Sequence, residues 1–88
     1  MDNPTSPEAA RLRILLADDH EPFRQRLRKL LLKTPDLDLV GEAGNGEEAV
    51  RLAGELKPEI VIMDVVMPRL NGVEATRRIT REFPSIKV

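Results

Sequence analysis

The hydrophobic residues of this chain fall into two alternating kinds of segment. Short apolar runs at residues 12–17 and 59–63, and a partly alternating run at 37–42, are typical of strands. Between and after these runs, apolar residues recur at spacings of three and four, which predicts helices. Residues 86–88 look like the start of a further strand. The repeated strand-helix order with short connections predicts an α/β fold with a parallel sheet and right-handed crossovers.

Prolines and asparagines mark the expected ends of the helices. Pro22 suits the first turn of the first helix, which should end before Pro35. Asn45 and Asn71 are each followed three residues later by a glutamate, a pattern typical of a helix N-cap with its reciprocal acid. The expected apolar stripes of the three helices are Phe23, Leu27, Leu30 and Leu31; Ala49, Leu52, Ala53 and Leu56; and Val73, Ala75, Ile79 and Phe83.

Two of the predicted strands run directly into carboxylates. Asp18 and Asp19 follow the first strand, and Asp64 follows the third. In an open parallel sheet, ligands bind in the crevice outside the carboxyl ends of the strands, so adjacent first and third strands would bring the three acids together there. An acid after a single strand is more often just a helix cap. The combination of all three favours a site for a cation and a phosphoryl group.

Composition narrows the classes of function. The 88 residues are enough for one small domain, and 2% aromatic content means that Leu, Ile and Val must fill the core. A net charge of -1 and the lack of a basic module argue against direct binding to nucleic acid. The chain has no cysteine, which excludes disulfides and sulfur-ligated metals. No apolar stretch is long enough for a membrane, so we expect a cytoplasmic protein.

The organisation along the chain is simple. Residues 1–11 include two prolines and small polar residues without apolar periodicity, and we expect a flexible lead-in there. Residues 12–88 are expected to form the domain.

The motifs resemble a known family. Residues 15–20 (Leu-Leu-Ala-Asp-Asp-His) and 61–74 (Val-Ile-Met-Asp-Val-Val-Met-Pro-Arg-Leu-Asn-Gly-Val-Glu) are similar to the receiver domain of two-component response regulators, and the resemblance runs from about Arg13 to Val88. The Asp-Asp-His start and the Asn-Gly-Glu-Glu-Ala entry to the second helix look most like the subfamily that carries a C-terminal helix-turn-helix. The resemblance implies a flavodoxin-like parallel sheet, here incomplete at about three and a half βα units, and a signalling domain rather than an enzyme.

The resemblance also implies a role for each acid. Asp64 would be the phosphoacceptor, Asp19 would supply a carboxylate to Mg²⁺, Asp18 would hold the ion through water, and the backbone carbonyl of Val66 would be a further ligand. The phosphodonor would be a sensor histidine kinase. The chemistry is sound, because a carboxylate can form an aspartyl phosphate once a cation offsets the repulsion between two anions.

The family pattern needs two further residues, a Ser or Thr ending the fourth strand and a Lys ending the fifth. Val88 ends the chain before both positions, and Lys87 lies at a strand start, so it should not be given the lysine's role. We therefore expect a truncated domain with an impaired switch. The third strand would become a long hydrophobic edge of the sheet, which favours a homodimer or larger assembly.

Two other functions fit parts of the pattern. The chain could be a self-associating or kinase-docking module without phosphotransfer, with Leu32 as an apolar contact on the first helix. That helix carries a basic set that is either a solvated face or a docking surface: Arg24, Arg26, Arg28, Lys29 and Lys33. A small metal-dependent phosphatase would need an acid two residues after the nucleophile, where Val66 stands.

Three loop residues have expected supporting roles. His20 should lie on the rim of the site. Pro68 should shape the loop after Asp64, and Gly72 should permit the approach of a helix N-terminus.

Overall fold

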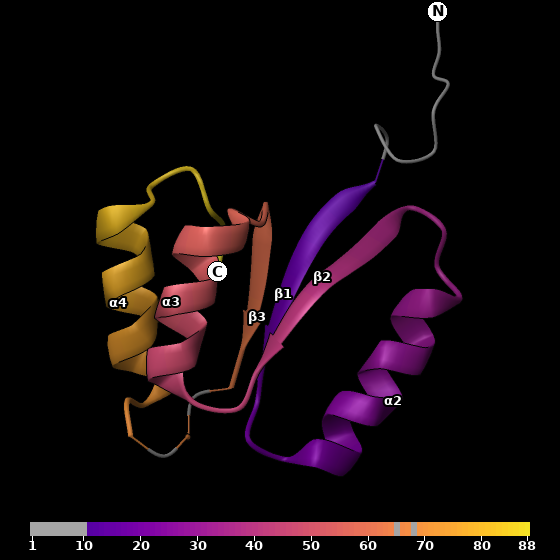
Figure 1. Ribbon diagram of the computed structural model, residues 1–88, viewed down its shortest axis with the longest axis horizontal. Coiled ribbons are helices and arrows are strands. Elements are labelled where there is room, and N and C mark those ends of the chain that lie inside the picture. The colour runs from indigo at the N-terminus through magenta and orange to yellow at the C-terminus, as the bar shows by residue number, and fades with distance from the viewer. Residues whose placement is uncertain (1–10, 65, 68) are drawn as a thin grey trace, which may run out of the picture.

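The computed structural model describes residues 11–64, 66–67 and 69–88 (Figure 1). The predicted lead-in therefore lies almost entirely outside the described residues, as does Pro68 with its expected role in the loop.

In the described part of the chain, three parallel strands form the sheet. They are β1 (Leu12–Ala17), β2 (Leu37–Ala43) and β3 (Ile60–Met63), in the order β2-β1-β3. The central position of β1 explains its continuous apolar sequence, because residues 14–17 are buried whichever face of the sheet their side chains point to. The partly alternating β2 lies at an edge. The predicted parallel α/β fold is confirmed.

Each strand is followed by a helix within the described residues: α2 (Glu21–Leu32), α3 (Gly46–Leu56) and α4 (Gly72–Glu82). Both predicted N-caps are present. The side-chain oxygen of Asn45 accepts a hydrogen bond from the Glu48 amide at 2.8 Å, and that of Asn71 accepts one from the Glu74 amide at 2.9 Å. Each cap satisfies a backbone N–H that the helix itself leaves without a partner.

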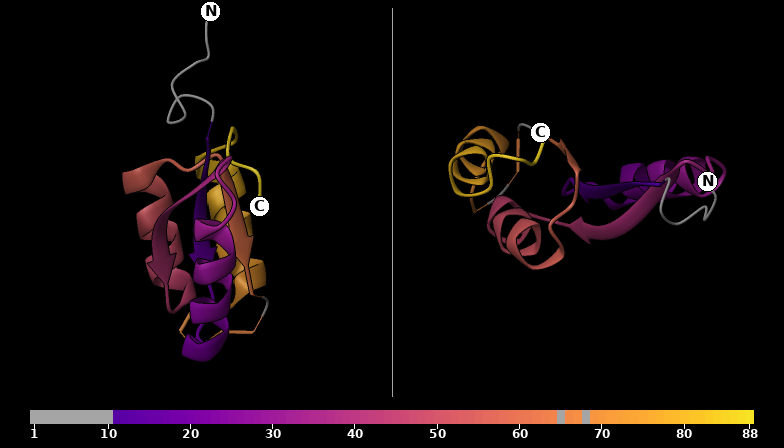
Figure 2. Two further views of the ribbon diagram at one scale, coloured as in Figure 1. Left: turned by 90° about the vertical axis from the view of Figure 1, so that its right-hand side faces the viewer. Right: turned by 90° about the horizontal axis from the view of Figure 1, so that it is seen from above.

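The helices cover the sheet unequally. Figure 2 shows α3 and α4 on one side of the sheet and α2 on the other. The main core lies under α3 and α4 and includes Leu15, Ala53, Val61 and Ile79. On α2 only Leu31 is buried.

The predicted apolar stripes are correct in position but only partly covered. Leu30 is 59% exposed, and Phe23 and Val73 are exposed as well. The reason on α2 is that this helix packs mainly against the edge strand β2, so part of its apolar face has no strand beneath it.

The prediction that β3 lies at an edge of the sheet is confirmed, but the free edge is shorter than expected. The strand has four residues, and its outer side is already paired in part. The Val61 amide donates to the Lys87 carbonyl at 2.7 Å, and the Lys87 amide donates to the Glu59 carbonyl at 3.0 Å. The predicted strand start at residues 86–88 is thus present as a single bridge, because the chain returns beside β3 after α4. Self-association through this edge stays a prediction.

Candidate divalent-cation and phosphoryl site

The strand register brings the acids to one end of the sheet. Ala17, the last residue of β1, is paired with both Ala43 of β2 and Met63 of β3. The next residues continue the pairing, since the Asp18 amide donates to the Ala43 carbonyl at 3.0 Å and the Asp64 amide donates to the Ala17 carbonyl at 2.9 Å. The two acids therefore leave neighbouring strands at the same level.

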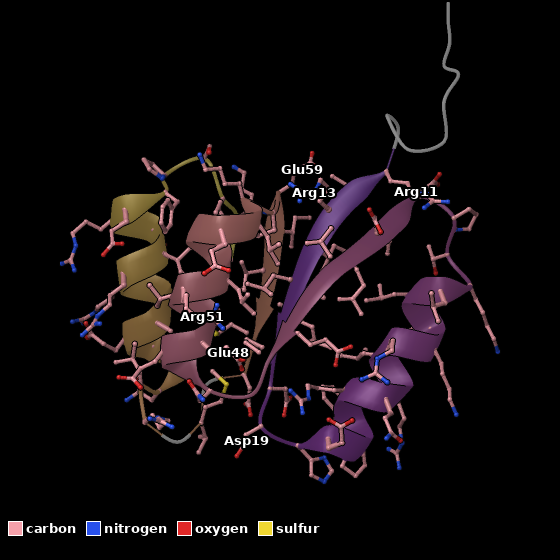
Figure 3. All side chains as sticks on the ribbon, in the orientation of Figure 1. Arg11, Arg13, Asp19, Glu48, Arg51 and Glu59 are labelled. Carbon is pink, nitrogen blue, oxygen red and sulfur yellow. The ribbon has the colours of Figure 1, made fainter. Side chains whose placement is uncertain are left out.

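The three predicted acids form a cluster. One carboxylate oxygen from each of Asp18, Asp19 and Asp64 lies within 4.8 Å of the others. Figure 3 shows Asp19 where β1 ends, at the opposite end of the sheet from Arg13 and Glu59. This proximity is what the sequence predicted, whereas the chemical role of each acid stays a prediction.

The three carboxylates differ in exposure and in hydrogen bonding. Asp18 is 8% exposed, and its Oδ1 accepts a hydrogen bond from the His20 amide at 2.8 Å. Asp64 is half-buried, and its Oδ1 accepts a long hydrogen bond of 3.4 Å from the Val66 amide. Asp19 is exposed. These bonds use only part of the acceptor capacity of the carboxylates, so oxygen lone pairs remain for a cation.

The charges of the cluster also suit a cation. Among the described residues, no lysine or arginine forms an ion pair with any of the three acids. Like charges this close repel each other, and a hard divalent ion with oxygen ligands offsets that repulsion. Mg²⁺ commonly uses one or two protein carboxylates and keeps several waters, so this donor set fits it.

The structure describes two of the residues that the sequence predicted near the three acids, Val66 and Gly72. The described part of the loop after Asp64 includes Val66, whose side chain is exposed; ligation through its backbone carbonyl stays a prediction. Gly72 is buried and begins α4.

A hollow of about 430 Å³ opens beside the acids on the α2 side of the sheet. Its lining includes Asp18, His20, Phe23, Ile62 and Asp64. His20 therefore lies at the rim, as the sequence predicted. Asp64 lines this hollow, and the walls of the hollow away from the acids are apolar.

The sequence interpretation missed the contacts that hold the loop after Asp64. Met67 is 6% exposed and packs in a cluster with Ala17, Ala43 and Ala49. Its apolar character within a loop was a usable signal. The backbone of Gly46, at the start of α3, also lies so close to the backbone of Leu70 that a side chain on Gly46 would not fit; no local pattern in the sequence signalled this contact.

None of the helices in the described part of the chain combines the length and the apolar character that crossing a bilayer requires.

Comparisons with known proteins point to one family. The family model for the response regulator receiver domain matches residues 14–88. The transcriptional regulatory protein LiaR of Bacillus subtilis is 47% identical over 77 residues, which is 88% of this chain and 36% of LiaR. The response regulator GacA of Pseudomonas viridiflava is 46% identical over 77 residues, again 88% of this chain and 36% of the relative. The chain thus spans about a third of the length of these relatives.

Solved structures agree with this fold. The response regulator domain of Thermotoga maritima CheB matches with a TM-score of 0.83 and 41% identity, over 85% of this chain and 56% of that one. A LuxR-family two-component response regulator from Aurantimonas sp. SI85-9A1 matches with a TM-score of 0.81 and 39% identity, over 86% of this chain and 54% of that one. The flavodoxin-like arrangement expected from the sequence is confirmed, and the chain belongs to the response regulator receiver domain family.

Proposed function

We propose that this chain is the phosphoacceptor domain of a two-component phosphorelay and that it receives the phosphoryl group on Asp64. The observation that supports this most is the cluster of three carboxylates within 4.8 Å at the carboxyl ends of two neighbouring strands. Response regulator receiver domains are signalling modules, and this cluster gives the chain the chemistry that such a module needs.

Exposure favours Asp64 as the acceptor. Asp18 also lines the hollow, but it is 8% exposed and its Oδ1 accepts a hydrogen bond from the His20 amide, so less of its carboxylate is open to an incoming group. Asp64 is half-buried and lines the hollow, where a donor can approach. Asp19 is exposed, and one of its carboxylate oxygens lies within 4.8 Å of those of the other two acids, which suits it to a bound cation.

The transfer is a displacement at phosphorus. A carboxylate oxygen of Asp64 forms a new bond to phosphorus while the bond from phosphorus to the donor breaks, and the leaving group departs with that electron pair. A Mg²⁺ ion held by Asp18, Asp19, Asp64 and the Val66 carbonyl would neutralise charge on the phosphoryl oxygens. Asp64 then carries a mixed anhydride, which water can hydrolyse.

Helix α2 is the surface that we expect a kinase to contact. Leu30 and Leu32 are exposed on α2, so that helix offers apolar contacts among its basic residues to a sensor histidine kinase. The expected impairment of the switch, and a self-associating role without phosphotransfer, stay predictions.

Intact-mass spectrometry tests the proposal. The chain is incubated with Mg²⁺ and acetyl phosphate, and we expect it to gain the mass of one phosphoryl group. Asp64→Asn should show no gain because it removes the nucleophilic oxygen, and chelation of Mg²⁺ should abolish the gain in the unchanged chain. Asp36→Asn is the matched control, since Asp36 is an exposed acid at the opposite end of the sheet.

Two results would contradict the proposal. An equal mass gain in Asp64→Asn would place the phosphoryl group elsewhere. The absence of any gain in the unchanged chain would favour the module without phosphotransfer.

A further inference from the structure

We propose that Gly46 is a positioning residue for the Mg²⁺ site, because the bare backbone in the first turn of α3 holds the loop that follows Asp64. The inference rests on the proposed function, since it concerns the metal ligands of that same site. In this inference, Gly46 makes the site selective for Mg²⁺ over larger divalent ions.

The contact at Gly46 is one that no other residue allows. A methyl group on Gly46 would overlap the carbonyl oxygen of Leu70 and would lie 2.6 Å from the carbonyl carbon. Gly46 does not adopt a positive φ, so the requirement is for space and not for an unusual backbone conformation. The helix and the loop therefore touch backbone to backbone, and an added methyl group must displace one of them.

Met67 fixes the middle of the same loop. Its side chain is buried against Ala17 and Ala43, the last residues of β1 and β2, and against Ala49 of α3. Asp18 directly follows Ala17. The loop is thus tied to the strand end that carries the acids and, through Gly46, to α3. Val66 directly precedes the buried Met67, and its amide donates a hydrogen bond to Asp64 Oδ1 at 3.4 Å, so both contacts limit the position of Val66.

The ion pair beside this contact contributes less. Arg69 Nε lies 3.1 Å from Glu47 Oε1, but the two side chains are 67% and 60% exposed. An ion pair this exposed is screened by solvent and is worth about 0–1 kcal/mol. The backbone contact at Gly46 and the burial of Met67 should therefore control the loop.

The expected consequence is a change in metal selectivity. Mg²⁺ requires near-ideal octahedral geometry with short bonds to oxygen, whereas Ca²⁺ tolerates variable geometry and longer bonds. A methyl group at Gly46 should displace Leu70 and, through the loop, the Val66 carbonyl, which would weaken the binding of Mg²⁺ more than that of Ca²⁺. A general loss of stability would weaken the binding of both ions alike.

The test compares Gly46→Ala with Gly54→Ala. Both variants add one methyl group to α3, but at Gly54 the methyl would meet the ring of Phe83 at 2.9 Å, near the end of α3 that is remote from the acids. Isothermal titration gives the Kd for Mg²⁺ and for Ca²⁺. In Gly46→Ala we expect the Mg²⁺ Kd to rise roughly tenfold and the Ca²⁺ Kd to rise clearly less. Gly54→Ala and Glu47→Gln should keep the selectivity of the unchanged chain.

Several outcomes would overturn the inference. Folded Gly46→Ala with unchanged selectivity would overturn it, as would an equal change in Gly54→Ala. If Gly46→Ala does not fold, Met67→Ala removes the second anchor without adding atoms, and unchanged selectivity in that variant is then the overturning result. If the unchanged chain binds no Mg²⁺, the proposed site itself is wrong. If the chain binds Mg²⁺ but neither Gly46→Ala nor Met67→Ala changes the selectivity, only this inference is wrong.

Discussion

At the scale of single residues, Glu42 shows how a charged side chain links a helix to the sheet. Glu42 lies on β2, and its Oε1 accepts a hydrogen bond from Arg28 Nη2 of α2 at 2.8 Å, while Arg24 Nε lies 3.9 Å from the same oxygen. The hydrogen bond from Arg28 lowers the pKa of Glu42, although partial burial acts in the opposite direction. Charge attraction to Arg28 and Arg24 adds to the lowering. The ionised carboxylate therefore helps to hold α2 on the sheet.

This lowered pKa predicts a pH dependence of stability. A carboxyl group with a lower pKa in the folded chain than in the unfolded chain stabilises the fold above its unfolded pKa and loses that contribution as the pH falls through its folded pKa. The free energy of unfolding should therefore decrease from about pH 5 downward. Urea unfolding over this range should show a shallower decrease for Glu42→Gln than for the unchanged chain.

A matched control for this prediction is Glu55→Gln. Glu55 pairs with Arg51 on the exposed face of α3, so its loss should leave the acid-range decrease almost unchanged. Equal slopes for the unchanged chain and Glu42→Gln would contradict the assigned role of Glu42.

The sequence predicted those site residues whose positions follow from the local pattern of apolar strands and the acids after them. Asp18, Asp19 and Asp64 could be found because each follows a recognisable strand, and parallel strands bring their carboxyl ends together. Gly46 could not be found in this way. Its importance comes from a contact with Leu70, and only the folded chain brings these two residues together.

At the scale of elements, the strands and helix starts were predictable because local chemistry sets them. Asn45 and Asn71 cap their helices as expected, since the amide that each satisfies is only three residues away. The coverage of the helices was less predictable. Periodicity shows which face of α2 is apolar, but the exposure of Leu30 depends on how far the sheet extends beneath that helix.

The outer edge of β3 also could not be predicted from local sequence alone. Its apolar sequence indicated a strand, but the pairing with Lys87 depends on the path of the chain after α4. The length of a free strand edge is a property of the tertiary fold.

At the scale of the whole molecule, one face of the sheet is left partly uncovered. Ile62 of β3 is 39% exposed and Phe23 of α2 is 41% exposed, and both line the hollow beside the acids. Apolar surface of this kind, next to a strand with partly unpaired backbone groups, favours contact with a second copy of the chain.

We therefore predict self-association at micromolar concentration. Light scattering should give an average mass that rises with protein concentration. Ile62→Thr should reduce this rise, because it keeps a β-branched side chain in the strand but adds a polar group to the uncovered face. Val73→Thr is the matched control, since Val73 is an exposed valine on α4, across the sheet. A single monomeric mass at all concentrations would contradict the prediction.

The most direct test of the whole account is the binding of Mn²⁺, which prefers the same oxygen ligands as Mg²⁺ and can be counted by electron paramagnetic resonance. We expect one ion to bind per chain, with an affinity that falls sharply in Asp19→Asn and in Asp64→Asn and is unchanged in Asp36→Asn. Undiminished binding in both Asp19→Asn and Asp64→Asn would show that the acids from β1 and β3 do not share an ion, and the account would be wrong.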